Sequence, residues 1–276
     1  MSEIRCDITD SVAGTGYSVH CLFSKSDIEN AVKRLKPGKG DGNVGLTTDH
    51  FRFACCDFYV HMSLLFSGLL THGSVRDEFS LNTVILMPEG RNDVSSDCSG
   101  YKGITLSSVF GKVLDLIILN RYTDILITSD LQFGFKAKRS TNMCTMVLKE
   151  AIDYYISNGS SVFCTLLDAT KAFGRVDYCK LFRSLMNRNL PSTVLRLLLN
   201  MYTRQVTRVS WNGEFSPPFT VSDGVKQGGV LSPILLYIYI DSLLKSLAVS
   251  LVGCFIGRLF VDALVYADDI VLLSHS

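Results

Sequence analysis

The segment Ala263–Leu273 (ALVYADDIVLL) places two adjacent carboxylates, Asp268 and Asp269, between two short apolar runs. This pattern predicts two short strands joined by a tight turn. Acidic residues in a turn are normally solvated, but these two have neighbours typical of a protein core. Because burial of two like charges is costly unless a cation neutralises them, the pair favours a divalent cation bound through oxygen ligands.

A third carboxylate stands in a similar setting. Asp168 ends Ser161–Asp168 (SVFCTLLD), a nearly continuous apolar run that predicts a strand buried on both faces. If this strand lies beside the hairpin, three carboxylates converge, as a two-metal phosphoryl-transfer site requires. An acidic turn and a helix N-cap would produce the same pattern, and the spacing alone leaves both interpretations open.

Helices and strands are mixed along the rest of the chain without a regular alternation, which favours an α+β fold over a doubly wound sheet. The apolar periodicity predicts helices over residues 26–36, 48–70, 109–122, 141–156, 178–187, 194–202 and 233–249, a strand over residues 82–88 and a hairpin at Asn212-Gly213.

The charge balance limits how the chain could bind nucleic acid. The 276 residues carry 27 Lys and Arg against 26 Asp and Glu, so any such site is a local basic stripe rather than a field over the whole protein. Residues 132–149 are the candidate stripe, because they contain no acidic residue and four basic ones: Lys136, Lys138, Arg139 and Lys149.

Location and membrane contact also follow from composition. The uncharged stretches 227–240 and 246–257 are shorter than a membrane-spanning helix, so they predict buried core and no membrane partner. The nine cysteines are scattered among apolar residues without a C-x-x-C pair, and the N-terminus has no secretion signal. Both features favour a reduced, intracellular location, nuclear or cytoplasmic, over secretion.

Four blocks occur in one order along the chain: LQFGFKAKRST, LLDATKAFGRV, DGVKQGGVLSP and YADDIVLL. Together they resemble the reverse transcriptases of non-LTR (LINE-type) retrotransposons over residues 35–275. The resemblance implies a right-hand polymerase of α+β class, with a reverse transcriptase domain over about residues 82–276. An N-terminal extension and fingers would occupy residues 1–160, and a palm, truncated after the YADD hairpin and without a thumb, residues 161–276.

The resemblance implies roles for individual residues. Asp168 and Asp268 match the principal metal-binding aspartates, and Asp269 matches the third carboxylate. The backbone carbonyl of Ala169 would complete a metal shell. Phe173 matches the bulky residue under the sugar, which leaves no room for a ribose 2′-hydroxyl.

Four further residues match substrate-binding positions. Gln227 and Gly228 match the loop that packs on the incoming base pair. Lys102 and Arg139 match fingers residues that would hold triphosphate or nucleic-acid backbone. The family usually has Arg where Lys102 stands, and Lys offers a point charge instead of a bidentate fork.

The implied activity is RNA-directed DNA synthesis. A DNA primer on an RNA template would be extended with dNTPs, using two Mg²⁺ ions or Mn²⁺, and the thumb and endonuclease regions of a parent polyprotein would be missing. The alternative is a catalytically inactive remnant that at most binds nucleic acid. The intact carboxylates favour the enzyme, whereas the truncation favours the remnant. So does Gly174, which stands where the family has an Asp expected to cap the next helix.

Overall fold

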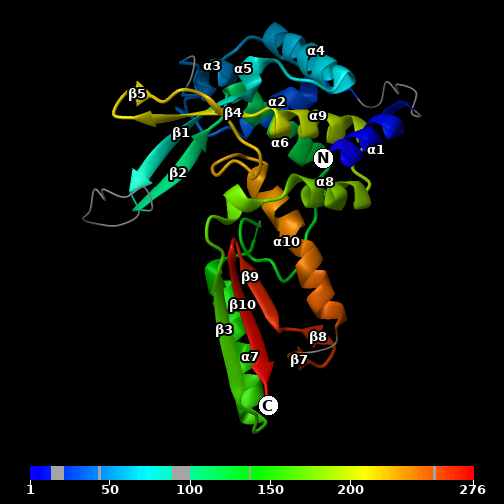
Figure 1. Ribbon diagram of the computed structural model, residues 1–276, viewed down its shortest axis with the longest axis vertical. Helices are drawn as coiled ribbons and strands as arrows, with labels where there is room; N and C mark the ends of the chain where they lie inside the picture. The colour runs from blue at the N-terminus through cyan, green and yellow to red at the C-terminus, as the bar shows by residue number, and fades with distance from the viewer. Residues whose placement is uncertain (14–21, 43–44, 89–99, 137, 251–252) are drawn as a thin grey trace. The chain divides into compact units, whose positions relative to one another are not determined.

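A computed structural model describes residues 1–13, 22–42, 45–88, 100–136, 138–250 and 253–276. Cys21 and Cys98, two of the nine cysteines, and Ala137 of the predicted basic stripe lie outside these ranges. The described residues form helices together with mixed and antiparallel sheets, a mixed α+β fold as predicted (Figure 1). They divide into two compact units, Met1–Leu126 with Phe173–Ser232 and Ile127–Ala172 with Pro233–Ser276. The fingers and palm boundary at residue 160 stays a prediction.

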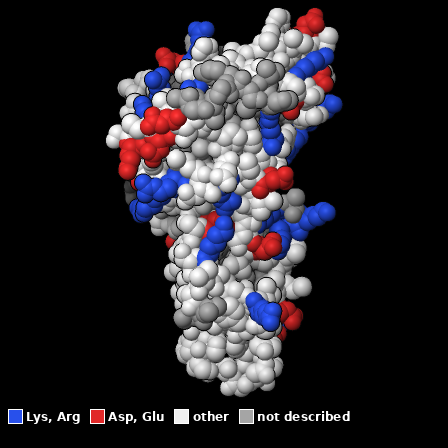
Figure 2. Space-filling model, turned by 90° about the vertical axis from the view of Figure 1, so that its right-hand side faces the viewer, with Lys and Arg blue, Asp and Glu red and all other residues white. Residues whose placement is uncertain are grey.

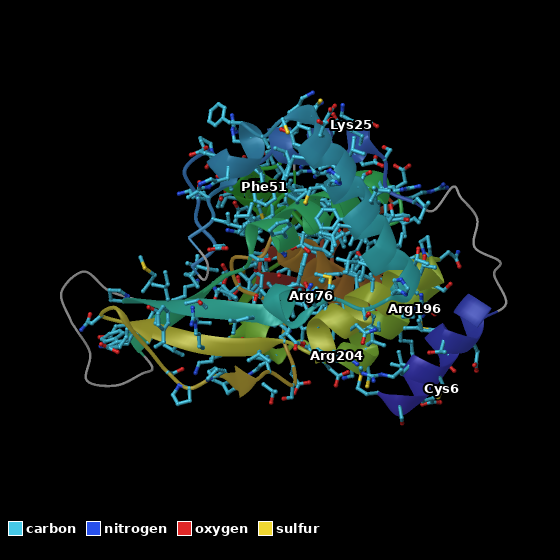
Figure 3. All side chains as sticks on the ribbon, turned by 90° about the horizontal axis from the view of Figure 1, so that it is seen from above. Cys6, Lys25, Phe51, Arg76, Arg196 and Arg204 are labelled. Atoms are coloured by element: carbon cyan, nitrogen blue, oxygen red, sulfur yellow. The ribbon has the colours of Figure 1, made fainter. Side chains whose placement is uncertain are left out.

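The first unit is rich in helices that bury their apolar sides against each other. Its helices are α1 (Ser2–Ala13), α2 (Lys25–Lys33), α3 (Thr48–Arg52), α4 (Cys56–His72), α5 (Asp77–Ser80), α6 (Val109–Arg121), α8 (Tyr178–Asn187) and α9 (Ser192–Thr203). Helix α2 packs against α4 and α6, and α9 packs against α1, α4 and α8. Figure 3 labels Phe51 of this core and Arg196, whose guanidinium donates to the carbonyl of Thr71 near the end of α4.

The prediction of one helix over residues 48–70 is wrong, because the chain leaves helical geometry at residues 53–55. A capping box between Thr47 and His50 fixes the start of the short helix α3, and Cys55 begins α4 anew. The interruption accompanies edge-to-face packing of Phe51 on Phe58 and Phe110, with ring centroids 5.3 and 4.9 Å apart.

The sheet of the first unit has the strand order β2-β1-β4-β5, and β6 also pairs with β4. The strands are β1 (Leu81–Pro88), β2 (Tyr101–Leu106), β4 (Val206–Trp211), β5 (Glu214–Phe215) and β6 (Phe219–Thr220). Strand β1 is antiparallel to β2 and parallel to β4. The hairpin predicted at Asn212-Gly213 is confirmed: both residues have positive φ, 50° and 85°, as this turn type requires.

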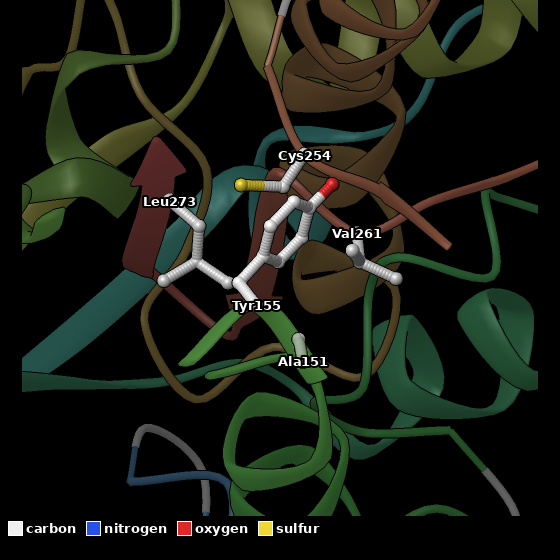
Figure 4. Close-up of a cluster of buried hydrophobic side chains, with 5 residues drawn as sticks. All are labelled: Ala151, Tyr155, Cys254, Val261 and Leu273. Carbon is white, nitrogen blue, oxygen red and sulfur yellow. The ribbon is translucent and has the colours of Figure 1, made fainter. Parts of the chain in front are cut away.

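The second unit is a three-stranded antiparallel sheet in the order β3-β10-β9. Its elements are β3 (Val162–Asp168), β9 (Ala263–Tyr266), β10 (Asp269–His275), α7 (Thr141–Ser157), α10 (Ser232–Val249) and the small hairpin β7 (Phe255–Ile256) and β8 (Leu259–Phe260). Helix α7 covers one face of β9 and β10, where Tyr155 packs with Leu273 (Figure 4). Helix α10 covers the opposite face, where Leu244 packs with Val265.

Helix α10 is longer than the uncharged stretches 227–240 and 246–257, each of which was predicted to be too short to span a membrane. It contains parts of both stretches, together with Asp241 and Lys245 between them. It is long and apolar enough to span a bilayer, as no other helix of the described residues is. Its packing on β9 and β10 accounts for many of its apolar side chains.

Strand β3 is exposed, so the prediction that it is buried on both faces is wrong. Phe163 is 62% exposed, Leu166 76% and Leu167 46%. Among the described strands β3 pairs with β10 alone, and the two helices lie mainly over β9 and β10. An apolar run therefore specified the strand correctly but did not specify what covers it.

Candidate active site

The acidic residues of the second unit meet at one end of its sheet. Asp269 begins β10 and pairs in register with Asp168, the last residue of β3, and with Tyr266 of β9. Asp268 precedes it in the two-residue turn. The prediction that the strand ending at Asp168 lies beside the hairpin is confirmed. Directly opposed residues in such a strand pair have Cβ atoms about 4.5–5.5 Å apart.

The carboxylates are less buried than the sequence suggested. Asp168, which ends the edge strand β3, and Asp269 are exposed, and Asp268 is half-buried. The reason to expect a cation is therefore the repulsion between like charges on opposed residues, not their burial. Among the described residues no three His, Cys, Asp or Glu side chains gather closely enough to enclose a metal ion. The donor set still fits Mg²⁺, which keeps several waters and uses only one or two carboxylates.

The carbonyl of Ala169 is partly engaged. Its oxygen accepts a hydrogen bond from the backbone N–H of Ala172 at 3.2 Å. A carbonyl oxygen has two lone pairs, so one remains for the predicted metal shell.

Two buried residues that the sequence analysis did not single out lie against the turn. The amide of Gln132 hydrogen-bonds to the backbone of Ala267, and the hydroxyl of Tyr237 has no hydrogen-bond partner among the described residues. Burial, and then Tyr266 and Asp268, raise the pKa of Tyr237, so its hydroxyl stays protonated. The sequence offered only a weak signal for Gln132, a lone amide among apolar residues, and none for Tyr237.

Two side chains of the predicted basic stripe bind to nearby residues of the same unit. Arg139 forms an ion pair with Asp130 at 2.7 Å and lies over the ring of Phe133. The ammonium of Lys136 donates to the carbonyls of Thr128 and Ser129, and burial lowers its pKa. On the face drawn in Figure 2 acidic and basic side chains are interspersed, without one continuous basic band.

The loop that carries Gln227 and Gly228 is docked on β2 within the first unit. The Thr105 N–H donates to the carbonyl of Gln227 at 2.7 Å. Gly228 has φ +103°, and a Cβ there would lie 3.1 Å from the Thr105 carbonyl oxygen, so this position requires glycine. Lys102 is an exposed residue of the same strand.

A buried acid that the sequence analysis missed lies at the other side of this loop. Asp115 of α6 is 8% exposed, and its carboxyl group lies near the backbone of Val230 and Leu231. Burial raises the pKa of Asp115 to about 6, although the Lys226 ammonium and the backbone N–H groups of Leu231 and Val230 lower it. The ammonium lies 5.9 Å from the ring centroid of Tyr202. The sequence did not indicate this position of Asp115, because α6 and residues 226–231 are far apart along the chain.

Phe173 belongs to the same unit as the loop. Its carbonyl accepts the N–H of Val225 at 2.7 Å, two residues before Gln227. The two segments touch so closely that a Cβ on Gly224 would lie 2.7 Å from the Gly174 Cα. Of the predicted site residues, Lys102, Phe173, Gln227 and Gly228 thus lie in the first unit, and Arg139, Asp168, Ala169, Asp268 and Asp269 in the second.

Gly174 is not the N-cap of α8, which corrects the expectation for the missing Asp. It lies in the 3-10 helix Ala172–Arg175, and Asp177 caps α8 by accepting the Lys180 N–H at 2.8 Å. The cap is three residues later than expected because the 3-10 helix intervenes.

Gly174→Asp is therefore expected to change the free energy of unfolding by no more than about 0.5 kcal/mol. An added Cβ meets no atom within 4 Å, and the helix already has its cap. Asp177→Ala, the matched variant, should lose about 1 kcal/mol. Urea unfolding of both variants checks this. The capping assignment is wrong if Gly174→Asp stabilises the protein by as much as Asp177→Ala destabilises it.

Comparisons with known proteins place the chain among polymerases. Residues 91–276 match the family model for reverse transcriptase (RNA-dependent DNA polymerase). The chain is 25% identical over 215 residues to a retrovirus-related Pol polyprotein from the type-1 retrotransposable element R2 of Nasonia vitripennis, covering 77% of this chain and 20% of that protein. It is 26% identical over 260 residues to the RNA-directed DNA polymerase from mobile element jockey of Drosophila funebris, covering 91% and 27%.

One solved structure, apo telomerase from Candida tropicalis truncated from the C-terminal domain, is 15% identical with a TM-score of 0.48, over 78% of this chain and 49% of that one. This similarity is too low to assign a fold or a function to the chain. The chain spans only 20% and 27% of the length of these two relatives. Because the family model covers more than half of the chain, the chain belongs to the reverse transcriptase (RNA-dependent DNA polymerase) family, and it resembles the non-LTR retrotransposon members.

Proposed function

We propose that this chain performs RNA-directed DNA synthesis for a non-LTR retrotransposon. The observation that carries the proposal is the register of β3 and β10, which sets Asp168 opposite Asp269 and beside Asp268 in a chain of this family. The partners are an RNA template, a DNA primer and dNTPs. In right-hand terms the chain supplies fingers and part of a palm.

The proposed reaction is a nucleotidyl transfer. The oxygen of the primer 3′-hydroxyl forms a bond to the α-phosphorus of a dNTP, the bond to pyrophosphate breaks, and the hydroxyl proton passes to solvent. Reverse transcriptases use divalent metals; here Asp168 and Asp268, with Asp269 and the Ala169 carbonyl, would hold two Mg²⁺ ions or Mn²⁺. When bound, such ions stabilise the charge on the attacking and leaving oxygens.

Substrate contacts are assigned to the remaining residues. Gln227 and Gly228 pack on the incoming base pair, which suits a loop held on β2 by the hydrogen bond from the Thr105 N–H to the Gln227 carbonyl. Lys102, exposed on β2, binds phosphate. Arg139 would have to exchange its Asp130 partner for phosphate to act in the same way.

The alternative is an inactive remnant that at most binds nucleic acid. One reason for it was that Gly174 replaces an Asp expected to cap α8, but Asp177 supplies this cap.

Primer extension by the purified chain tests the proposal. An RNA template with an annealed DNA primer, dNTPs and Mg²⁺ should give short, salt-sensitive products, because Arg139 and Lys136 of the predicted basic stripe are already engaged within the protein. Omission of Mg²⁺ is the control. Metal-independent products, or products with NTPs but none with dNTPs, would contradict the proposal.

Phe173→Val is expected to raise the use of ribonucleotides relative to dNTPs by about tenfold or more. A shorter side chain vacates the space that we assign to the 2′-hydroxyl, and one such steric contact is worth about 1–3 kcal/mol. The ratio of kcat/KM for a matched NTP and dNTP measures it, with Phe163→Val as a control on exposed β3. An unchanged ratio in an active Phe173→Val variant would leave Phe173 as a packing residue only.

A further inference from the structure

The side chain of Gln132 is bound to the turn that carries the acidic residues. Its oxygen accepts the N–H of Ala267 at 3.2 Å, and its nitrogen donates to the carbonyl of the same residue at 3.3 Å. The oxygen also accepts the N–H of Gly134 at 2.9 Å. Gln132 is 1% exposed, so the amide is fixed within the protein and not in solvent.

The backbone around Gln132 is fitted to the same hairpin. Leu131 and Phe133 exchange hydrogen bonds of 2.9 and 2.8 Å with Val265, so this segment runs along the free edge of β9. At Gly134 an added Cβ would lie 2.4 Å from the nitrogen of Ala267. The segment therefore reaches the turn at a distance that permits no side chain.

The turn needs such support. Ala267 has φ +61°, a left-handed conformation that costs a residue other than glycine about 1–2 kcal/mol. The next two residues are Asp268 and Asp269, so the backbone angles of Ala267 set where both carboxylates begin. A bidentate amide can hold this conformation because it binds the N–H and the C=O of one residue together.

We propose that Gln132 is a positioning residue for the catalytic carboxylates. Its amide holds Ala267 in the left-handed conformation and thereby keeps Asp268 and Asp269 aligned with Asp168. Its effect on catalysis rests on the function proposed above. The clamp itself, by which we mean the two hydrogen bonds between the Gln132 amide and the backbone of Ala267, does not depend on that function.

Gln132→Met tests the proposal, because Met fills a similar volume and removes every hydrogen bond to Ala267. Gln205→Met is the matched control, since Gln205 is another buried glutamine, 3% exposed, in the first unit. Mn²⁺ is the probe, titrated into the full chain and followed by calorimetry. Gln132→Met should weaken Mn²⁺ binding by about tenfold or more, in the range seen when a residue that orients a metal ligand is removed. Gln205→Met should bind as the parent does.

Amide hydrogen exchange supplies a readout that needs no metal. The amides of Ala267 and Asp268 should exchange at least about tenfold faster in Gln132→Met than in the parent, while α7 keeps its protection. Ala267→Gly, which removes the cost of positive φ, should restore part of the lost Mn²⁺ affinity in the Gln132→Met background. Parent-like Mn²⁺ affinity and exchange in Gln132→Met would overturn the clamp.

The two proposals fail in different ways. If the parent chain binds no Mn²⁺ but the turn still loses protection in Gln132→Met, the metal assignment fails and the clamp survives. If Asp268→Asn abolishes Mn²⁺ binding while Gln132→Met changes neither readout, the metal assignment survives and the clamp fails. Unfolding of the whole second unit in Gln132→Met would appear as a loss of protection in α7 as well, and the comparison is then made in the Ala267→Gly background, where the cost of positive φ is absent.

Discussion

Asp268→Asn is expected to lower the rate of nucleotide addition by at least about a thousandfold, equivalent to about 4 kcal/mol of barrier. The change removes the carboxylate that we assign as a metal ligand in the turn, while the amide keeps the size of the side chain. Thermal stability without metal should stay equal or rise, because one of three neighbouring like charges is gone. Single-turnover primer extension and a thermal melt of the same preparation measure both effects.

A matched control separates the site from the general loss of charge. Asp153 is an exposed acid on α7 of the same unit, and Asp153→Asn should extend primers at the parent rate. The assignment of Asp268 does not survive if both variants retain the parent rate, or if Asp268→Asn loses activity only because it unfolds.

Asp115→Ala is expected to lower the free energy of unfolding by about 3 kcal/mol. The change removes the acidic side chain that lies near the backbone N–H groups of Val230 and Leu231, and a buried polar group left without a partner costs about 1–3 kcal/mol. Asp115→Asn keeps an acceptor oxygen, so it should lose much less. Urea unfolding at pH 5 compares the two variants, and equal losses in Ala and Asn would show that the polar contact of Asp115 with the loop is unimportant.

The same pair of variants has a defined pH dependence. The folded-state pKa of Asp115, about 6, is raised above its ordinary value of 3.8. The stability that this group contributes is therefore fully present below about pH 4 and is lost as the pH rises through 6. Asp115→Asn cannot titrate, so its stability relative to the parent should increase over this window. A constant difference from pH 4 to 7 would contradict the raised pKa.

Local patterns predicted the parts of the structure that depend on neighbours in sequence. The helices over α6, α7 and α8 follow from apolar spacing within two residues of the observed ends, and the Asn212-Gly213 turn follows from its need for positive φ. The convergence of Asp168 with the YADD hairpin could also be inferred, because strand ends that carry acids are brought together by one sheet register.

Contacts between distant segments were beyond the reach of those patterns. The apolar residues of β3 suggested burial, yet covering depends on where α7 and α10 lie. Likewise Gln132 and Asp115 read as ordinary polar residues in apolar surroundings, and their roles appear only with Ala267 and Leu231 placed against them. The break between α3 and α4 depends on a local cap that competes with a continuous apolar period.

The most direct test of the account compares the parent chain with Asp168→Asn for binding and for chemistry in the same preparation. Binding of a fluorescent RNA–DNA primer-template should be equal in the two proteins within about twofold, because phosphate contacts and not the carboxylates supply the affinity. Addition of a single dNTP in Mg²⁺ should occur in the parent and fall by at least about a thousandfold in Asp168→Asn. Equal rates of addition, with binding intact in both, would contradict the claim that Asp168 opposite Asp269 is the centre of nucleotidyl transfer.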